Sequence, residues 1–251
     1  MTGPRPAVQF TDEGEAADLT AFLARLIHYD RAAAVRLQAS GALLGVFGRP
    51  ASFEVLAIRT ARLVKPYEHG FAGTLDVTVS AGDLLESVDE RAATAVLPRP
   101  VTGPAWAGVL PPRGGWRPQP GLPGPAALRK IVAEVVAEFR ARTQALAPEQ
   151  RSRAALDQIG QDVWSRPVGD TQLPVRAVHA AHALGFLREP PAPPDQPGAP
   201  APSGSGAPAH PADVPGSVAL LASGAWLRLR TPYGSIAVRR SGTGQLPLTP
   251  A

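Results

Sequence analysis

Apolar residues near the start of the chain recur with the spacing of one helical face. Asp12 and Glu15 lie three residues apart, as the two polar members of a helix-capping box do. The pattern therefore predicts an amphipathic helix that begins near residue 12 and ends around Tyr29. The residues of its apolar stripe are Leu19, Phe22, Leu23, Leu26 and Ile27.

The next part of the chain changes to the patterns of β-strands. Residues 35–38 alternate between apolar and polar side chains, and residues 43–47 are continuously apolar. The Ser40-Gly41 dipeptide and the Gly48-Arg49-Pro50 sequence are turn signals between strands. We expect further strands at 53–58, 74–79 and 94–97, and a short helix at 83–88.

Helical periodicity returns in residues 126–188. Pro125 precedes this region at a position where the first turn of a helix tolerates proline. Pro148 interrupts the pattern, and Gly185 is suited to end a helix, so three helices are predicted. The apolar face of the first helix consists of Leu128, Ile131, Val132, Val135, Val136 and Phe139.

Proline-rich segments separate these regions. Residues 98–125 contain Trp106 and Trp116, which we expect to dock the segment onto the body of the protein. The Pro111-Pro112-Arg113 sequence also resembles a polyproline ligand for an SH3-type groove. Residues 189–217 hold ten prolines and four glycines with almost no large apolar side chain, which predicts a disordered linker. Residues 241–251 are expected to form a flexible tail.

Taken together, these patterns predict an α+β protein with a mainly antiparallel sheet and flanking helices. Residues 1–97 form its N-terminal α+β region, and residues 126–188 form the three-helix segment. Residues 218–240 have the pattern of a C-terminal β-hairpin, which is too short to be stable alone. We therefore expect the hairpin to return across the linker and rejoin the sheet or the core.

The first predicted hairpin and the last one share a sequence pattern. Residues 35–44 and 218–227 both read Val-x-Leu-x-Ala-Ser-Gly-Ala-x-Leu. After a shorter second turn, Ala57-Ile58-Arg59 matches Ala237-Val238-Arg239. A structural duplication explains this similarity, and so does independent use of the same turn chemistry.

Alternation in the C-terminal hairpin separates two faces of the predicted sheet. Leu227 and Leu229 point to one side, so the residues between them point to the other. Guanidinium groups beside an indole are suited to phosphates, to a stacked base or to an aromatic ligand. The alternative is a solvated face on which a loop partly covers the indole. The candidate binding residues are Trp226, Arg228, Arg230 and Arg239.

The composition restricts the available chemistry. Cysteine is absent, which excludes disulfides, thiolate metal sites and cysteine nucleophiles. The formal net charge of +4 is carried almost entirely by arginine and is a weak electrostatic argument for nucleic acid. No apolar run is long enough to span a membrane, and residues 1–6 lack the apolar core of a signal peptide. We therefore expect a cytoplasmic protein without membrane contact.

Catalytic and cofactor motifs are not evident in the sequence. The chain has no P-loop, dinucleotide-binding fingerprint or nucleophile elbow, so we expect no catalytic residue and no cofactor. His179 and His182 share one face of a predicted helix, but no third zinc ligand lies near them in the sequence. We expect no metal site, and the alanine-rich surroundings of the two histidines indicate a helix–helix contact.

Two parts of the sequence resemble other proteins. The set of Trp106, residues 111–116, residues 180–186 and residues 226–229 resembles uncharacterised proteins of high-GC actinobacteria, a resemblance that implies no functional residues. The sequence Asp76-Val77-Thr78-Val79, followed by Asp83-Leu84-Leu85, is similar to a strand–helix step in sterol-carrier-like domains. The second resemblance implies an α+β sheet with an apolar ligand pocket, although the later helical region departs from that pattern.

These observations favour a non-enzymatic binding or regulatory protein that acts through contacts with another protein. The first alternative is a nucleic-acid-binding protein that uses the arginine-bearing sheet face. The second is a carrier of a small apolar ligand, or an enzyme, with a sterol-carrier-like sheet. A steep salt dependence of nucleic-acid retention supports the first alternative, and an enclosed apolar pocket supports the second.

Overall fold

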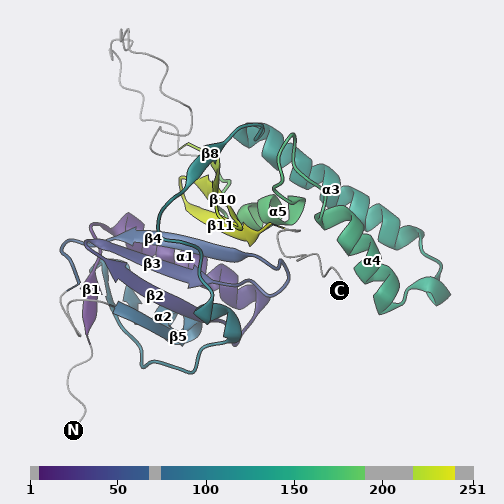
Figure 1. Ribbon diagram of the computed structural model, residues 1–251. Coiled ribbons are helices and arrows are strands. Elements are labelled where there is room, and N and C mark those ends of the chain that lie inside the picture. Colours follow the sequence, from purple (N-terminus) through teal and green to yellow (C-terminus); the bar gives the residue numbers. More distant parts are fainter. Residues whose placement is uncertain (1–5, 68–74, 190–216, 241–251) are drawn as a thin grey trace, which may run out of the picture.

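The computed structural model describes residues 6–67, 75–189 and 217–240 of the chain (Figure 1). Helices and mainly antiparallel strands form an α+β fold in these residues, which confirms the predicted fold class. The expected flexible tail at 241–251 lies outside the described residues, as does all of the expected linker except its two end residues, Glu189 and Ser217.

The main sheet has eight strands, and all of its neighbouring strands pair antiparallel. Three short strands, in the order β1-β7-β6, form a second sheet. The strands of the main sheet, in spatial order, are β5 (Leu75–Ser80), β2 (Ala34–Ser40), β3 (Leu43–Gly48), β4 (Leu56–Arg62), β11 (Gly234–Arg239), β10 (Trp226–Thr231), β9 (Ala219–Ser223) and β8 (Arg117–Gln119). Those of the second sheet are β1 (Ala7–Gln9), β7 (Thr94–Val96) and β6 (Val88–Asp89).

The helices begin and end close to the residues that the sequence predicts. In the first helix, the side chain of Asp12 accepts a hydrogen bond from the backbone N–H of Glu15, as the capping pattern predicts. Pro125 occupies the first turn of the third helix. The helices are α1 (Glu13–Tyr29), α2 (Ala81–Ser87), α3 (Pro125–Ala145), α4 (Arg153–Trp164) and α5 (Val175–Ala183).

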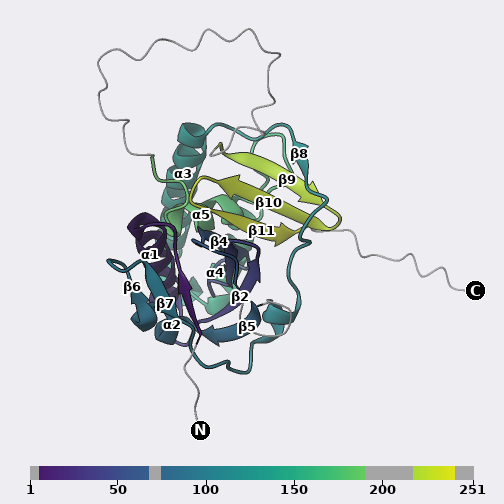
Figure 2. The same ribbon diagram turned by 90° about the vertical axis from the view of Figure 1, so that its left-hand side faces the viewer.

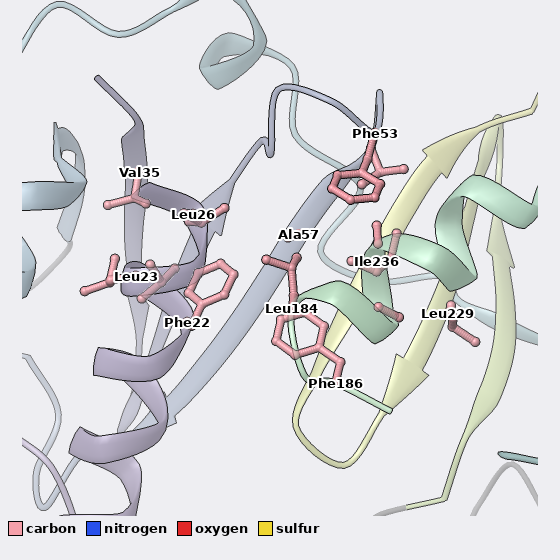
Figure 3. Packing of buried hydrophobic residues seen from close by; sticks show 14 of the residues in the cluster. Phe22, Leu23, Leu26, Val35, Phe53, Ala57, Leu184, Phe186, Leu229 and Ile236 are labelled. Atoms are coloured by element: carbon pink, nitrogen blue, oxygen red, sulfur yellow. The ribbon is translucent and has the colours of Figure 1, made fainter. Parts of the chain in front are cut away.

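The main core lies between one face of the sheet and the helices α1, α3 and α5, which lie on the left of the sheet in Figure 2. Figure 3 shows its central part, where the ring of Phe22 on α1 stacks on Phe186 at 5.7 Å between ring centroids. Ala57 of β4 and Ile236 of β11 are paired beneath these rings, and both are fully buried. One core is therefore built from the N-terminal and the C-terminal thirds of the chain.

The C-terminal hairpin rejoins the sheet through β11, as the sequence analysis expects. Leu56, Ala57 and Ile58 of β4 pair with residues 237, 236 and 235 of β11. This pairing places the three C-terminal strands beside the N-terminal ones and makes one continuous sheet from segments far apart in the sequence.

The two similar hairpins occupy equivalent positions on either side of this junction. In both, the turn has two residues, Gly41-Ala42 and Gly224-Ala225, and its glycine has a positive φ: 55° at Gly41 and 52° at Gly224. Only glycine adopts that conformation without strain, and φ is positive at the first central residue alone, as in a type II′ turn. The shared Ser-Gly sequence therefore has the same structural cause in both hairpins.

The third strands are also equivalent, but with a different alignment from the one the sequence suggests. Ala57 pairs with Gly48 in the first unit, and Gly234 pairs with the equivalent Thr231 in the second. Ala57 thus corresponds to Gly234 in the structure. The residue that the sequence alignment matches to Ala57 is Ala237, which lies three residues after Gly234 and faces the other side of the sheet. The sequence alignment of Ala57–Arg59 with Ala237–Arg239 was wrong, because composition can match where strand register does not.

A local twofold axis relates the two units. Under the corrected alignment Ile58 corresponds to Ser235, and these two residues pair with each other across the junction. The axis therefore passes between β4 and β11. Helices α1 and α5 precede the two three-stranded units and pack against β4 and β11, and β5 and β8 form the outer edges.

A buried ionic network lies on the core side of the junction. Arg59 of β4 is 6% exposed, and its Nη2 donates to Glu15 Oε2 at 3.0 Å and to Asp18 Oδ2 at 3.1 Å. Its Nη1 donates to the backbone oxygen of Tyr233 at 3.0 Å. Arg188 donates to Asp18 Oδ1 at 2.6 Å, and its guanidinium carbon lies 3.6 Å from the ring centroid of Tyr233. The network connects α1 and β4 to the turn between β10 and β11.

A row of aromatic rings connects the helices to the end of β3. His179 of α5 stacks on Trp164 of α4 at 4.6 Å and meets the edge of Phe53 at 5.0 Å. Burial, followed by the nearby charge of His182, lowers the pKa of His179 below its ordinary value. His179 therefore serves a helix–helix contact of the kind that the sequence predicts.

We expect the stability of the protein to fall as pH decreases from 7.5 to 5.5. Because the pKa of His179 is lower in the folded state, the unfolded chain binds the proton first, and acid favours unfolding. The loss begins near the unfolded pKa of roughly 6.5 and continues down to the folded value. Thermal midpoints across this pH range measure the effect. The variant His179→Phe keeps an aromatic ring and should flatten the slope, and an unchanged slope would contradict the assignment.

Candidate binding surface

The structure places the candidate residues of β10 on the sheet face opposite the helices, here called the outer face. Leu227 and Leu229 are almost fully buried on the core side. Trp226, Arg228 and Arg230 alternate with them and are half-buried rather than exposed. Something on the outer face therefore covers these three side chains.

The cover is the proline-rich segment between β7 and β8, which runs along the right side of the sheet in Figure 2. At one edge the backbone N–H of Val101 donates to the oxygen of Thr78 in β5 at 2.9 Å. At the other edge the hydroxyl of Ser223 in β9 donates to the oxygen of Gly114 at 3.2 Å. Residues 101–114 thus cross the outer face from one side of the sheet to the other.

Trp106 anchors this segment at the centre of the outer face. It lies in a short 3-10 helix, Ala105–Gly108, and packs with Leu110 on a second, smaller apolar cluster. The sheet residues of this cluster are Phe47, Leu56, Ile58, Trp226 and Ala237. The cluster contains side chains from both symmetric units, and it accounts for the partial burial of Trp226.

Two of the pockets beside the crossing segment are lined by candidate residues. The first, here called the Trp226 pocket, has a volume of about 300 Å³ and lies between Trp106 and Trp226. Arg49, Glu54 and Arg239 provide its charges, and the guanidinium carbon of Arg239 lies 5.4 Å from the centroid of the Trp226 ring. Glu54 has a φ of 52°, a left-handed conformation that is uncommon for a residue other than glycine.

The second pocket, here called the Arg228 pocket, has a volume of about 250 Å³ and lies under Pro111-Pro112-Arg113 and Trp116. The sheet contributes Phe47 and Ile58 to its apolar wall. The indole N–H of Trp116 donates to the oxygen of Pro112 at 3.0 Å, which fixes the ring above the pocket. The guanidinium carbon of Arg228 lies 5.7 Å from the centroid of that ring.

Arg228 lies in a partly buried environment with a second cation nearby. Its Nε is buried without a hydrogen-bond partner, and among the described residues no carboxylate forms an ion pair with it. Burial, followed by the charge of Arg230, lowers the pKa of the Arg228 guanidinium. A desolvated cation of this kind is costly unless an anion approaches it.

The carboxylate of Asp76, on the same side of the sheet, is already engaged. Asp76 of β5 accepts from Arg36 Nε at 2.6 Å and from Gln38 Nε2 at 3.2 Å. The hydrogen bond from Arg36, together with smaller contributions from Gln38 and Arg113, lowers the pKa of Asp76. Asp76 therefore forms its ion pair with Arg36 and not with Arg228.

The structure distributes the four candidate residues over two sites. Trp226 and Arg239 line the Trp226 pocket, and Arg228 lines the Arg228 pocket. Arg230 lies one cross-strand row further along, opposite Ser235. Sequence reasoning missed Phe47, Trp116 and Arg113 as neighbours of Arg228 because they come from other parts of the chain.

Neither a metal site nor a membrane-spanning helix is evident in the described residues. Among them no cluster of three or more histidine, cysteine, aspartate or glutamate side chains is arranged to hold a metal ion. In the same residues, none of the helices combines the length and apolar character needed to cross a membrane.

Comparison with protein families divides the chain close to the covering segment. The model of the family described as Domain of unknown function (DUF8185) matches residues 111–243, which is more than half of the chain. The chain belongs to the DUF8185 family. Residues 4–108 match a second model, Domain of unknown function (DUF8010). Searches of curated proteins and of solved structures found no similar protein.

The DUF8185 match and the DUF8010 match meet between Gly108 and Pro111, at the centre of the outer face. The junction of β4 with β11 and the cluster around Trp106 combine residues from both matched segments. Both pockets of the outer face also take their lining from the two segments. Residues of the DUF8185 and the DUF8010 segments therefore form the candidate surface together.

Proposed function

We propose that this protein binds another protein through the outer face of its main sheet. The observation that carries the proposal is the concave arrangement of Arg228 and Trp116, with a guanidinium that is desolvated and lacks an anionic partner among the described residues. Arginine and tryptophan are the residue types most enriched among those that dominate binding energy in protein interfaces.

The composition of the wider outer face supports the same proposal. Three tryptophans, Trp106, Trp116 and Trp226, are half-buried on it, and Leu43 is 47% exposed beside the Arg228 pocket. Apolar side chains surrounded by charged groups form the usual anatomy of a protein interface, with an apolar centre and a polar rim. The charged groups here are mainly guanidiniums, which favours an acidic partner surface.

Photo-crosslinking tests the proposal. A benzoylphenylalanine at position 43 places the reactive group on the outer face, and the same residue at position 153 places it on α4, where Arg153 is exposed. We expect a discrete crosslinked protein from position 43 that position 153 does not give.

The affinity of that partner is then compared between variants. Arg228→Gln should raise the Kd at least tenfold, which corresponds to about 1.4 kcal/mol. The matched control Arg153→Gln removes one exposed arginine elsewhere and should leave the Kd unchanged. Equal Kd values for both variants would argue against the outer face as the interface.

Single-stranded nucleic acid is the second candidate for this face. Indole rings beside guanidiniums are suited to base stacking, and Trp226 with Arg239 has that arrangement. This alternative predicts that an oligonucleotide binds with a steep salt dependence that Arg239→Gln reduces. A crosslinked protein whose affinity depends only weakly on salt favours the first proposal.

A further inference from the structure

We propose that the Arg228 pocket binds a side-chain carboxylate from an acidic segment of a partner protein. The inference deepens the proposed function and rests on it. It names the chemical group that the outer face recognises and the residue that receives it.

The first argument is the missing counter-charge. Arg228 holds a positive charge at a pocket wall, its Nε has no hydrogen-bond partner, and Arg230 adds a second positive charge nearby. A buried guanidinium without a counter-charge is strongly unfavourable. Binding of an anion next to Arg228 would therefore be favourable. Arg113 at the rim of the same pocket provides a further donor.

The second argument is that the described chain does not supply this anion. Asp76 is held by Arg36 and Gln38, and Glu54 lines the separate Trp226 pocket. Apart from the cationic Arg113, the polar side chains that share the Arg228 pocket are neutral ones, those of Gln38, Ser40 and Thr60. We therefore assign the charge complement of Arg228 to a bound molecule.

The third argument is the shape and lining of the pocket. Its walls are apolar and come from Phe47, Ile58, Trp116 and the two prolines above them. A carboxylate on a short methylene stem places its charge at Arg228 and its stem against these rings, and an aspartate or glutamate side chain has that form. Phosphate groups are more often held by helix N-termini and by several exposed cations, whereas the lining of this pocket includes no helix residue and one exposed cation, Arg113.

Arginine side-chain NMR on the full chain tests the assignment directly. The Nε–H signal of Arg228 is identified as the one that disappears in Arg228→Gln. Propionate serves as the probe for a glutamate side chain, propionamide as its neutral match, and inorganic phosphate as the competing anion, all at constant ionic strength.

We expect propionate to shift the Arg228 signal in a saturable manner and propionamide to leave it unchanged. The Trp116 indole N–H, which is retained in Arg228→Gln, should respond to propionate in the native chain but not in that variant. The matched variant Arg239→Gln changes the other pocket and should retain the full response at Arg228.

Three results would overturn the inference. These are a shift that sodium chloride reproduces, an equal response to propionamide, and a phosphate affinity at least tenfold above that of propionate. The last result would indicate a phosphorylated ligand or a nucleic acid instead. The probe titrations use the unmodified chain, and the variant Arg228→Gln serves only to assign the signal and as the control.

The outcome is distinguishable from failure of the proposed function. If propionate binds but the crosslinked partner is insensitive to Arg228→Gln, the pocket stands and the protein interface is wrong. If the partner depends on Arg228 and propionate has no effect, the interface stands and the carboxylate assignment is wrong.

Discussion

Arg59→Met is expected to lower the free energy of unfolding by about 3–5 kcal/mol, the usual cost of removing one partner from a buried ion pair. The substitution keeps an unbranched side chain but leaves Glu15, which is 8% exposed, and Asp18 without their central donor. It also removes the hydrogen bond to the oxygen of Tyr233, which ties β4 to the β10–β11 turn. Urea unfolding monitored by circular dichroism measures the change.

The matched control is Arg62→Met on the same strand. Arg62 also pairs with Glu15, at 2.8 Å, but its side chain is 67% exposed. Because solvent screens the exposed Arg62, its pair with Glu15 should contribute only about 1 kcal/mol, so this variant should remain close to the native stability. The double variant Glu15→Met with Arg59→Met removes both charges and should recover part of the loss. Similar losses from Arg59→Met and Arg62→Met would show that the buried network is not the cause.

Separating the DUF8010 and DUF8185 segments is expected to abolish independent folding of both. The fragment 1–109 exposes the inner edge of β4, and the fragment 110–251 exposes that of β11. Each also loses its share of one apolar core, including the stacked pair of Phe22 and Phe186. Unpaired edges with apolar faces aggregate, so each fragment alone should be insoluble or unfolded.

Produced together, the two fragments should assemble one to one and recover the circular dichroism spectrum of the intact chain. Ile236→Asp in the second fragment places a charge on the buried side of β11 and should prevent assembly. Cooperative melting of fragment 1–109 alone, at the midpoint of the intact protein, would contradict the single core that the structure describes.

Local pattern was sufficient for most elements of the fold. The spacing of Leu19, Phe22 and Leu26 predicted α1, and alternation in β2 and β10 predicted which of their residues are buried. The pairing of β4 with β11 was expected only in general terms, because it joins residues about 180 positions apart and no local signal fixes its register. The three-residue error in aligning the third strands has the same origin.

The candidate surface shows a similar division between local and non-local information. Alternation was enough to group Trp226, Arg228 and Arg230 on one face. It could not reveal that Trp106 and Trp116 cover that face, because the position of a proline-rich segment depends on the whole sheet beneath it. Nor could it show the desolvation of Arg228, which follows from that cover.

The twofold relation between the two halves of the sheet has a consequence for the length of any recognition motif. The positions of β3 equivalent to Trp226, Arg228 and Arg230 hold Leu43, Gly45 and Phe47, so symmetry-related sites are apolar in one half and cationic in the other. Phe47 and Arg230 share one cross-strand row and are separated by three strand spacings, or about 14 Å. An extended peptide lying across the strands covers roughly 3.3 Å per residue. An extended ligand peptide that spans both halves should therefore cover about four residues between the apolar position at Phe47 and the cationic position at Arg230.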